Sequence, residues 1–152
     1  EARFAHLYKK ERRHWLPLTQ RELELAGIFL YWGEGRKGLA GQLSLNNTDP
    51  QVLKFILYWL INALKVPKDK IRGYIHLYSE IDLNQEIKFW SQELKLPLSR
   101  FCKPYIKKSK KSDLDHKGFG HGTCGIVVND VRLKEKIMMA IKSVADHYSK
   151  KI

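Results

Sequence analysis

Two kinds of hydrophobic pattern alternate along the chain and predict a domain of interleaved helices and strands. Some segments repeat apolar residues at the three-to-four-residue spacing of amphipathic helices, and shorter ones alternate apolar with polar residues as strands do. The predicted helices are 3–14, 20–33, 50–64, 83–94 and 131–148, and the predicted strands are 42–47, 71–78, 101–108 and 122–129. This order predicts an α+β fold with about four mainly antiparallel strands, helices on one face and a basic opposite face.

Local signals set the ends of the first elements. Pro17 stops the first helix, so we expect residues 1–16 to form a basic N-terminal helix and residues 17–152 the main domain. Thr19, with Glu22 three residues later, matches a capping box for the second helix. From residue 23 this helix is apolar on nearly every face, which predicts burial on all sides, in a core or against a partner.

Charge is distributed unevenly along the chain. Its 152 residues include 28 Lys+Arg and 16 Asp+Glu, a net charge of +12. Residues 22–99 are neutral, whereas residues 1–21, 100–131 and 132–152 each contribute +4. This distribution predicts a directed electropositive surface and an anionic partner. A membrane is disfavoured, because the basic segments lack a long apolar face and no apolar run is long enough to cross a bilayer.

The two cysteines indicate a cellular compartment but no particular metal-binding or redox role. Cys102 and Cys124 are too few for a disulfide scaffold, so we expect a reducing, cytoplasmic location. Together with His116 and His121 they are the residue types of a zinc site, but their spacing lacks the Cys-x-x-Cys pairs of structural zinc. Zinc is therefore disfavoured.

The densest basic segment, residues 103–111, places five lysines around Tyr105 and Ile106. In a strand Lys103, Tyr105 and Lys107 share one face. Lysines that alternate with an aromatic residue predict contact with nucleic acid, whose phosphates attract them. The alternative is a solvated edge strand that its lysines protect from aggregation.

Other polar residues extend the predicted nucleic-acid surface. Asn46 and Asn47 could pair with adenine edges, or they could only cap the turn before a helix. His76 could contact a phosphate or be hydrogen-bonded within the sheet. The full set of predicted DNA-binding residues is Arg36, Lys37, Asn46, Asn47, His76, Tyr105, Lys108, Lys110 and Lys111.

The segment 25–35, LAGIFLYWGEG, combines small residues with a terminal acid. Ala26 and Gly33 are two turns apart on one helix face with Leu30 between them, which would let two such helices approach closely. Glu34 ends the helix, where the dipole disfavours a carboxylate unless a cation neutralises it. The alternative is a buried core helix with a glycine at its C-terminus and one exposed glutamate.

This segment resembles the LAGLIDADG motif of homing endonucleases. The resemblance implies a saddle-shaped sheet that lies in the DNA major groove and a homodimer packed through its motif helices. The implied interface residues are Ala26, Gly27, Leu30 and Gly33. It also implies that Glu34 of each subunit binds Mg²⁺ or another divalent cation at the scissile phosphates of double-stranded DNA, with Lys103 or Lys107 as the basic catalytic residue.

The chain departs from the family pattern both within the motif and after it. Trp32 stands where the family has an additional acid, and one strand, rather than a hairpin, is evident after the motif helix. These departures weaken the case for cleavage more than the case for DNA binding, but the resemblance still implies a double-stranded DNA-binding protein that acts as a metal-dependent endonuclease. The alternatives are a regulator that binds DNA on the same fold without cleaving it, or a basic RNA-binding module.

Overall fold

The computed structural model describes residues 1–38, 41–78, 82–103, 105–107 and 121–152, with the backbone alone at 77–78 and 105–107. The α-helices in these ranges are α1 (Ala2–Trp15), α2 (Gln20–Glu34), α3 (Pro50–Asn62), α4 (Leu83–Leu94) and α5 (Val131–Ser149). The strands are β1 (Leu43–Asn47), β2 (Ile71–Tyr78), β3 (Tyr105–Lys107) and β4 (Thr123–Val128), and two 3₁₀ turns are η1 (Lys68–Lys70) and η2 (Leu98–Arg100). All these helices and strands lie where the sequence pattern predicts them.

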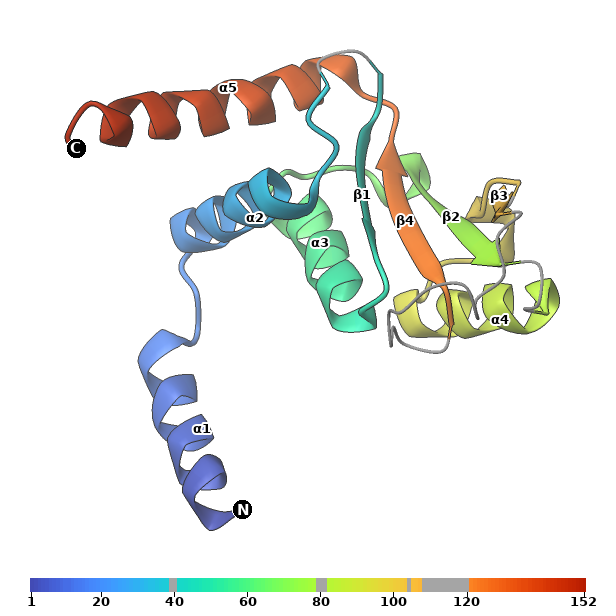
Figure 1. Ribbon diagram of the computed structural model, residues 1–152, viewed down its shortest axis with the longest axis horizontal. Helices are drawn as coiled ribbons and strands as arrows, with labels where there is room; N and C mark the ends of the chain where they lie inside the picture. Colours follow the sequence, from blue (N-terminus) through green and yellow to red (C-terminus); the bar gives the residue numbers. More distant parts are fainter. Residues whose placement is uncertain (39–40, 79–81, 104, 108–120) are drawn as a thin grey trace.

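The strands form one sheet in the order β1-β4-β2-β3 (Figure 1). Strand β4 pairs antiparallel with β1 on one side and with β2 on the other. The short strand β3 extends the β2 edge in parallel. The prediction of an α+β fold with a mainly antiparallel sheet is therefore confirmed. The predicted strand 101–108 was too long, because Phe101 forms only an isolated bridge with Gly73 and residues 102–103 are irregular; residue 108 lies outside the described ranges.

Alternation in the three antiparallel strands separates a buried face from an open one. The buried face carries Leu43, Leu45, Ile71, Ile75, Cys124, Ile126 and Val128, none more than 3% exposed. Helices α2, α3, α4 and α5 contribute side chains to the same core, including the fully buried rings of Trp59 and Trp90. The helices thus pack on one face of the sheet, as predicted.

Helix α2 begins as the sequence predicts and packs closely on α3. Thr19 and Glu22 form the reciprocal hydrogen bonds of a capping box. Gly27 lies directly against the indole of Trp59, whose Nε1 donates to the carbonyl of Glu24 at 3.1 Å. A side chain at position 27 would overlap that indole, so the absence of a Cβ permits the close helix approach.

One prediction about α2 was wrong, and a second stays untested. Gly27 does not belong to an interface with a second copy, because its own chain covers it with Trp59. Leu25, Phe29 and Trp32 are 44%, 44% and 39% exposed in the single chain, so burial of this face against a partner stays a prediction. The other face of the helix, by contrast, contributes Leu23 and Tyr31 to the core.

Helix α1 projects from the rest of the molecule and contains no buried residue (Figure 1). Its exposed apolar residues include Phe4 and Tyr8, at 68% and 64%. Among the described helices, none is long and apolar enough to cross a bilayer.

Candidate functional site

The open face of the sheet forms a polar hollow of about 630 Å³. Strand residues that alternate with the core positions make its floor: Ser44, Asn46, Arg72, Tyr74, His76 and Val127. Its rim includes Glu34 and Arg36 from the end of α2 and Lys103 from the segment after η2. The hollow therefore joins residues that lie far apart in the sequence.

Tyr74 and Asn46 make the centre of this floor by meeting across β4. The register aligns Asn46, Gly125 and Tyr74 on the neighbouring strands β1, β4 and β2. Gly125 has no side chain, so the Tyr74 ring can pass over it and donate its hydroxyl hydrogen bond to Asn46 Oδ1. Burial raises the pKa of the Tyr74 hydroxyl, partly offset by the hydrogen bond with Asn46. The hydroxyl consequently stays neutral and can act as a donor.

The β2 side of the hollow carries an imidazole and an ammonium group. His76 is half-buried, and its ring meets that of Tyr74 edge-on with the ring centroids 4.9 Å apart. The backbone N–H of Cys102 donates to the carbonyl of Gly73 at 2.7 Å. This contact holds the segment after η2 beside β2 and sets the exposed Lys103 on the rim.

The end of α2 is attached to the outer edge of β1. Gly35 forms an isolated bridge with Leu45, and the N–H of Arg36 donates to the carbonyl of Ser44 at 2.9 Å. The hydroxyl of Tyr31 donates to the carbonyl of Arg36 at 2.6 Å, so the position of this backbone is set from the core side. Gly35 crosses so near the Tyr31 ring that a Cβ would collide with it. The glycine that ends the motif therefore permits the exit path that brings Glu34 and Arg36 to the hollow.

Positive charge dominates the hollow. Arg36, Arg72 and Lys103 are exposed at its surface, and among the described lining residues Glu34 is the one carboxylate. None of the salt bridges between described residues includes any of these four groups. They are thus available to an external ligand.

A further cation, Lys134 in the first turns of α5, is buried beneath this end of the sheet. Its Nζ donates to the carbonyl of Gln42 at 2.9 Å. Burial lowers the pKa of the Lys134 ammonium, and the charge of Arg36 lowers it further. Lys134 therefore connects α5 to the chain just before β1.

In the described part of the chain, Glu34 is not joined by the other ligand side chains of a metal-binding group. No group of three or more His, Cys, Asp or Glu side chains among the described residues could hold a metal ion. The Glu34 carboxylate is exposed, and Asn47 Nδ2 lies 3.5 Å from its Oε2. A single carboxylate suits Mg²⁺, which keeps several waters and also takes phosphate oxygens as ligands.

Of the four residues considered for zinc, His121 and Cys124 have other surroundings in the structure. His121 Nδ1 lies 3.0 Å from Oε2 of the buried Glu86, and its ring stacks on Phe89. Cys124 is fully buried, and burial strongly raises the pKa of its thiol. Cys102 is exposed, and His116 lies outside the described residues.

The structure brings together Glu34, Arg36, Asn46, His76 and Lys103 from the predicted set. Lys37 instead caps α2, with its Nζ donating to the carbonyl of Trp32 at 2.9 Å. Asn47 Oδ1 accepts from the N–H of Asp49 at 2.8 Å, which is the turn role given as its alternative.

The remaining predicted residues lie at the limits of the described structure. Tyr105 pairs with His76 and Lys107 with Tyr78, and only their backbone is described. Lys108, Lys110 and Lys111 lie outside the described residues. Of the two candidate catalytic lysines, Lys103 is therefore the one whose side chain the structure describes at the hollow.

Sequence analysis missed Arg72, which supplies one of the cations of the hollow. The signal was present, because Arg72, Tyr74 and His76 alternate along β2 and so share one face. Ser44 and Gln42 were missed because the strand pattern alone does not reveal that the end of α2 lies beside β1.

No protein-family model, curated protein or solved structure that we compared with the chain matches it. The resemblance of residues 25–35 to the LAGLIDADG motif therefore rests on the residues themselves.

Proposed function

We propose that the chain binds double-stranded DNA through the hollow on the open face of its sheet, as a homodimer of LAGLIDADG type that cleaves DNA with a divalent cation at Glu34. In this proposal the sheet is the saddle that lies in the major groove. The observation that carries it is the composition of the hollow: Arg36, Arg72 and Lys103 around one carboxylate, with no ion pair among the described residues that neutralises them.

The floor of the hollow suits recognition of base edges better than binding of a small anion. Asn46 on β1 and Tyr74 on β2 place an amide and a hydroxyl on one row of the floor, on either side of Gly125 of β4. Phosphate contacts position a duplex, and base edges are distinguished by such donors and acceptors. The cations at the rim would therefore contact phosphates, and the floor would face the bases.

The exposed face of α2 supports the homodimer. Leu25, Phe29 and Trp32 form an apolar stripe, and the adjacent Gly33 faces open space. Ala26 and Leu30 are half-buried beside this stripe. Compared with the interface implied by the motif, the proposed interface retains Ala26, Leu30 and Gly33, excludes Gly27 and includes the stripe. Because Glu34 follows Gly33 directly, pairing of two α2 helices would bring two Glu34 carboxylates together.

The chemistry follows from this pairing. A Mg²⁺ bound by Glu34 would activate a water molecule and stabilise negative charge on the scissile phosphate. Lys103 and Arg36 would hold that phosphate and offset the charge that develops on its oxygens. His76 and Tyr74 stay on the floor, where they orient the duplex.

A regulator that binds DNA without cleavage is the second candidate. It is favoured because the described lining of the hollow contains a single carboxylate and because Trp32 stands where the family has an additional acid. A basic RNA-binding module is the third, and competition between duplex DNA and folded RNA distinguishes it.

Binding is tested by titrating a labelled DNA duplex with the wild type, Arg72→Gln and Lys136→Gln. Both substitutions remove one exposed positive charge, but Lys136 lies on α5 and does not line the hollow. We expect Arg72→Gln to weaken binding about tenfold and to reduce the salt dependence by about one phosphate contact. Equal losses in the two variants would contradict the proposal. Cys102 gives an independent measurement, because DNA in the hollow should protect its exposed thiol from alkylation while Cys124 stays buried.

Cleavage is tested by plasmid nicking in Mg²⁺ with the wild type and Glu34→Gln. The endonuclease proposal expects nicking that Glu34→Gln abolishes while duplex binding persists. Binding with no nicking in either protein would favour the regulator, and equal nicking in both would exclude Glu34 as the metal ligand.

A further inference from the structure

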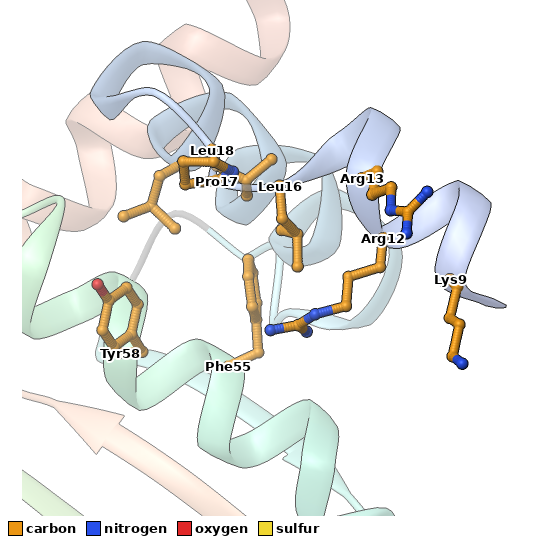
Figure 2. Close-up of a pocket in the computed structure, with 9 residues that line it drawn as sticks. Lys9, Arg12, Arg13, Leu16, Pro17, Leu18, Phe55 and Tyr58 are labelled. Carbon is orange, nitrogen blue, oxygen red and sulfur yellow. The ribbon is translucent and has the colours of Figure 1, made fainter.

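A second hollow, of about 760 Å³, lies where α1 meets the body of the molecule (Figure 2). It is separate from the site on the sheet, because the two share no lining residue. Its walls come from the last turns of α1, the linker that follows and the outer surfaces of α2 and α3. Its volume is within the range of sites that hold a ligand or a few side chains of a partner.

The floor of this hollow is apolar and partly exposed. Leu16, Pro17 and Leu18 of the linker face Phe55 and Tyr58 of α3 across it (Figure 2). Leu16 is 46% and Tyr58 57% exposed. Contiguous apolar surface of this kind on a charged protein indicates an interaction site.

The apolar residues of α1 do not cover this floor. Helix α1 carries an apolar stripe that includes Phe4, Leu7 and Tyr8, but none of these residues lines the hollow. The helix instead presents Lys9, Arg12 and Arg13 to it. In Figure 2 the Arg12 side chain points toward Phe55.

These three cations determine the charge of the occupant. Among the described residues no acidic side chain lines the hollow, and no salt bridge includes Lys9, Arg12 or Arg13. Their position near the C-terminus of α1 favours positive charge through the helix dipole, but it does not explain three cations beside an apolar floor. A ligand with both negative charge and apolar bulk complements the two features together.

An acidic protein segment fits these features better than the other anionic partners. A second copy of the chain brings another +12 to a wall that is already positive. Nucleic acid would find phosphate partners in the wall and the rings of Phe55 and Tyr58 for stacking, but the Tyr58 hydroxyl is the one side-chain polar group that the described floor offers to base edges. A short amphipathic helix can place Leu or Phe on the floor and Asp or Glu beside the wall.

From this complementarity we infer that the hollow between α1 and α3 is a docking site for an acidic amphipathic segment of a partner protein. One or two bulky apolar side chains of that segment fill the floor between Leu16, Phe55 and Tyr58. Its carboxylates pair with Lys9, Arg12 and Arg13. The site is distinct from the hollow on the sheet, so its occupation does not depend on the proposed DNA-binding function.

The probe is a labelled synthetic peptide with Leu and Phe on one helical face and Glu and Asp on the other, titrated against the full chain by fluorescence anisotropy. Tyr58→Ala removes an exposed ring of the floor, and we expect it to weaken binding about tenfold, as loss of an aromatic anchor does. Arg12→Glu reverses a charge of the wall and should weaken binding at least as much. Lys150→Glu makes the same change at the exposed far end of the chain and should leave the affinity unchanged.

A second peptide, with the apolar residues replaced by Ala and every acid kept, tests whether charge alone causes binding. The proposal would be overturned by equal affinity for the two peptides or by failure of the first peptide to bind at low salt. Equal losses of affinity in Arg12→Glu and Lys150→Glu would also overturn it. So would displacement of the peptide by single-stranded DNA whose own binding requires Tyr58, which would assign the site to nucleic acid. Self-association that Tyr58→Ala abolishes would assign it to a second copy.

Discussion

Neighbouring residues of the same strand serve different purposes on the two faces of the sheet: those on one face pack in the core, and those on the other line the hollow. Along β4, Cys124, Ile126 and Val128 enter the helix-covered core, and Gly125 and Val127 face the hollow. On the covered face shape matters most, since helices approach until a single Cβ would collide. On the open face polarity matters most, since side chains from separate strands must meet one another and still present groups to a ligand. A glycine is required on both sides, under Trp59 in one case and under Tyr74 in the other.

The largest expected effect is on the covered face. Gly27→Ala would place a methyl group inside the Trp59 indole, so we expect the free energy of unfolding to fall by about 3 kcal/mol. Gly33→Ala, in the same helix, faces open space and should leave stability unchanged or raise it by up to about 1 kcal/mol. Urea denaturation of both variants measures the difference, and similar stabilities would show that α2 and α3 do not pack as described.

The Gly33→Ala variant also tests the exposed face of α2. If two α2 helices pair closely at Gly33, the added methyl group should weaken self-association although the monomer is no less stable. Light scattering measures this self-association. Unchanged self-association would remove Gly33 from the proposed interface.

A smaller effect is expected on the open face. Gly125→Ala would displace the Tyr74 ring from β4 and break its hydrogen bond with Asn46, so we expect a loss of about 2 kcal/mol in stability. Duplex binding should weaken as well, because the floor of the hollow changes shape. Thr123→Ala in the same strand is the control, and equal behaviour of the two variants in denaturation and DNA titration would contradict the geometry of the floor.

The smallest effect concerns Lys134, a charge on the covered side. Because its pKa is lowered in the folded state, the folded chain releases this proton at a lower pH than the unfolded chain does. Between that lowered pKa and the ordinary lysine pKa of about 10.4, the unfolded chain binds more protons, so this group makes stability rise with pH. Lys134→Met should remove that rise and leave stability at neutral pH within about 1 kcal/mol of the wild type.

Subtracting the variant from the wild type at each pH isolates Lys134 from groups that act in the opposite direction. Burial raises the pKa of Tyr31 and Tyr74, and their contributions are lost as pH rises. These contributions are common to both proteins and cancel in the difference. A difference that does not depend on pH would mean that Lys134 is not buried as a cation.

Much of the fold could be predicted from local patterns. Thr19 with Glu22 caps α2 as predicted, and Asp49 and Asp82 cap the helices that begin at the predicted residues 50 and 83. Such contacts join residues a few positions apart, so they can be recognised without knowledge of the tertiary structure. The strand 101–108 was overextended because its alternation continues beyond the residues that find a partner strand.

The site could be predicted only in part. Glu34, Arg36 and Lys103 were identified from local charge and from the resemblance of residues 25–35, and the structure brings them to one hollow. Lys37 looked equivalent to Arg36 but caps α2 instead. Adjacent residues can point in different directions, and their roles depend on which backbone carbonyl lies within reach.

Sequence alone determined the elements of this protein, their order, the caps that begin its helices and the excess of positive charge. Each of these follows from residues near one another in the chain or from simple composition. The tertiary structure decided which side of α2 stays exposed, that Gly27 serves Trp59 instead of a second copy, and that Arg72 joins Arg36 and Lys103. Those outcomes depend on contacts between residues many positions apart, and only the register of the sheet and the packing of the helices bring such residues together.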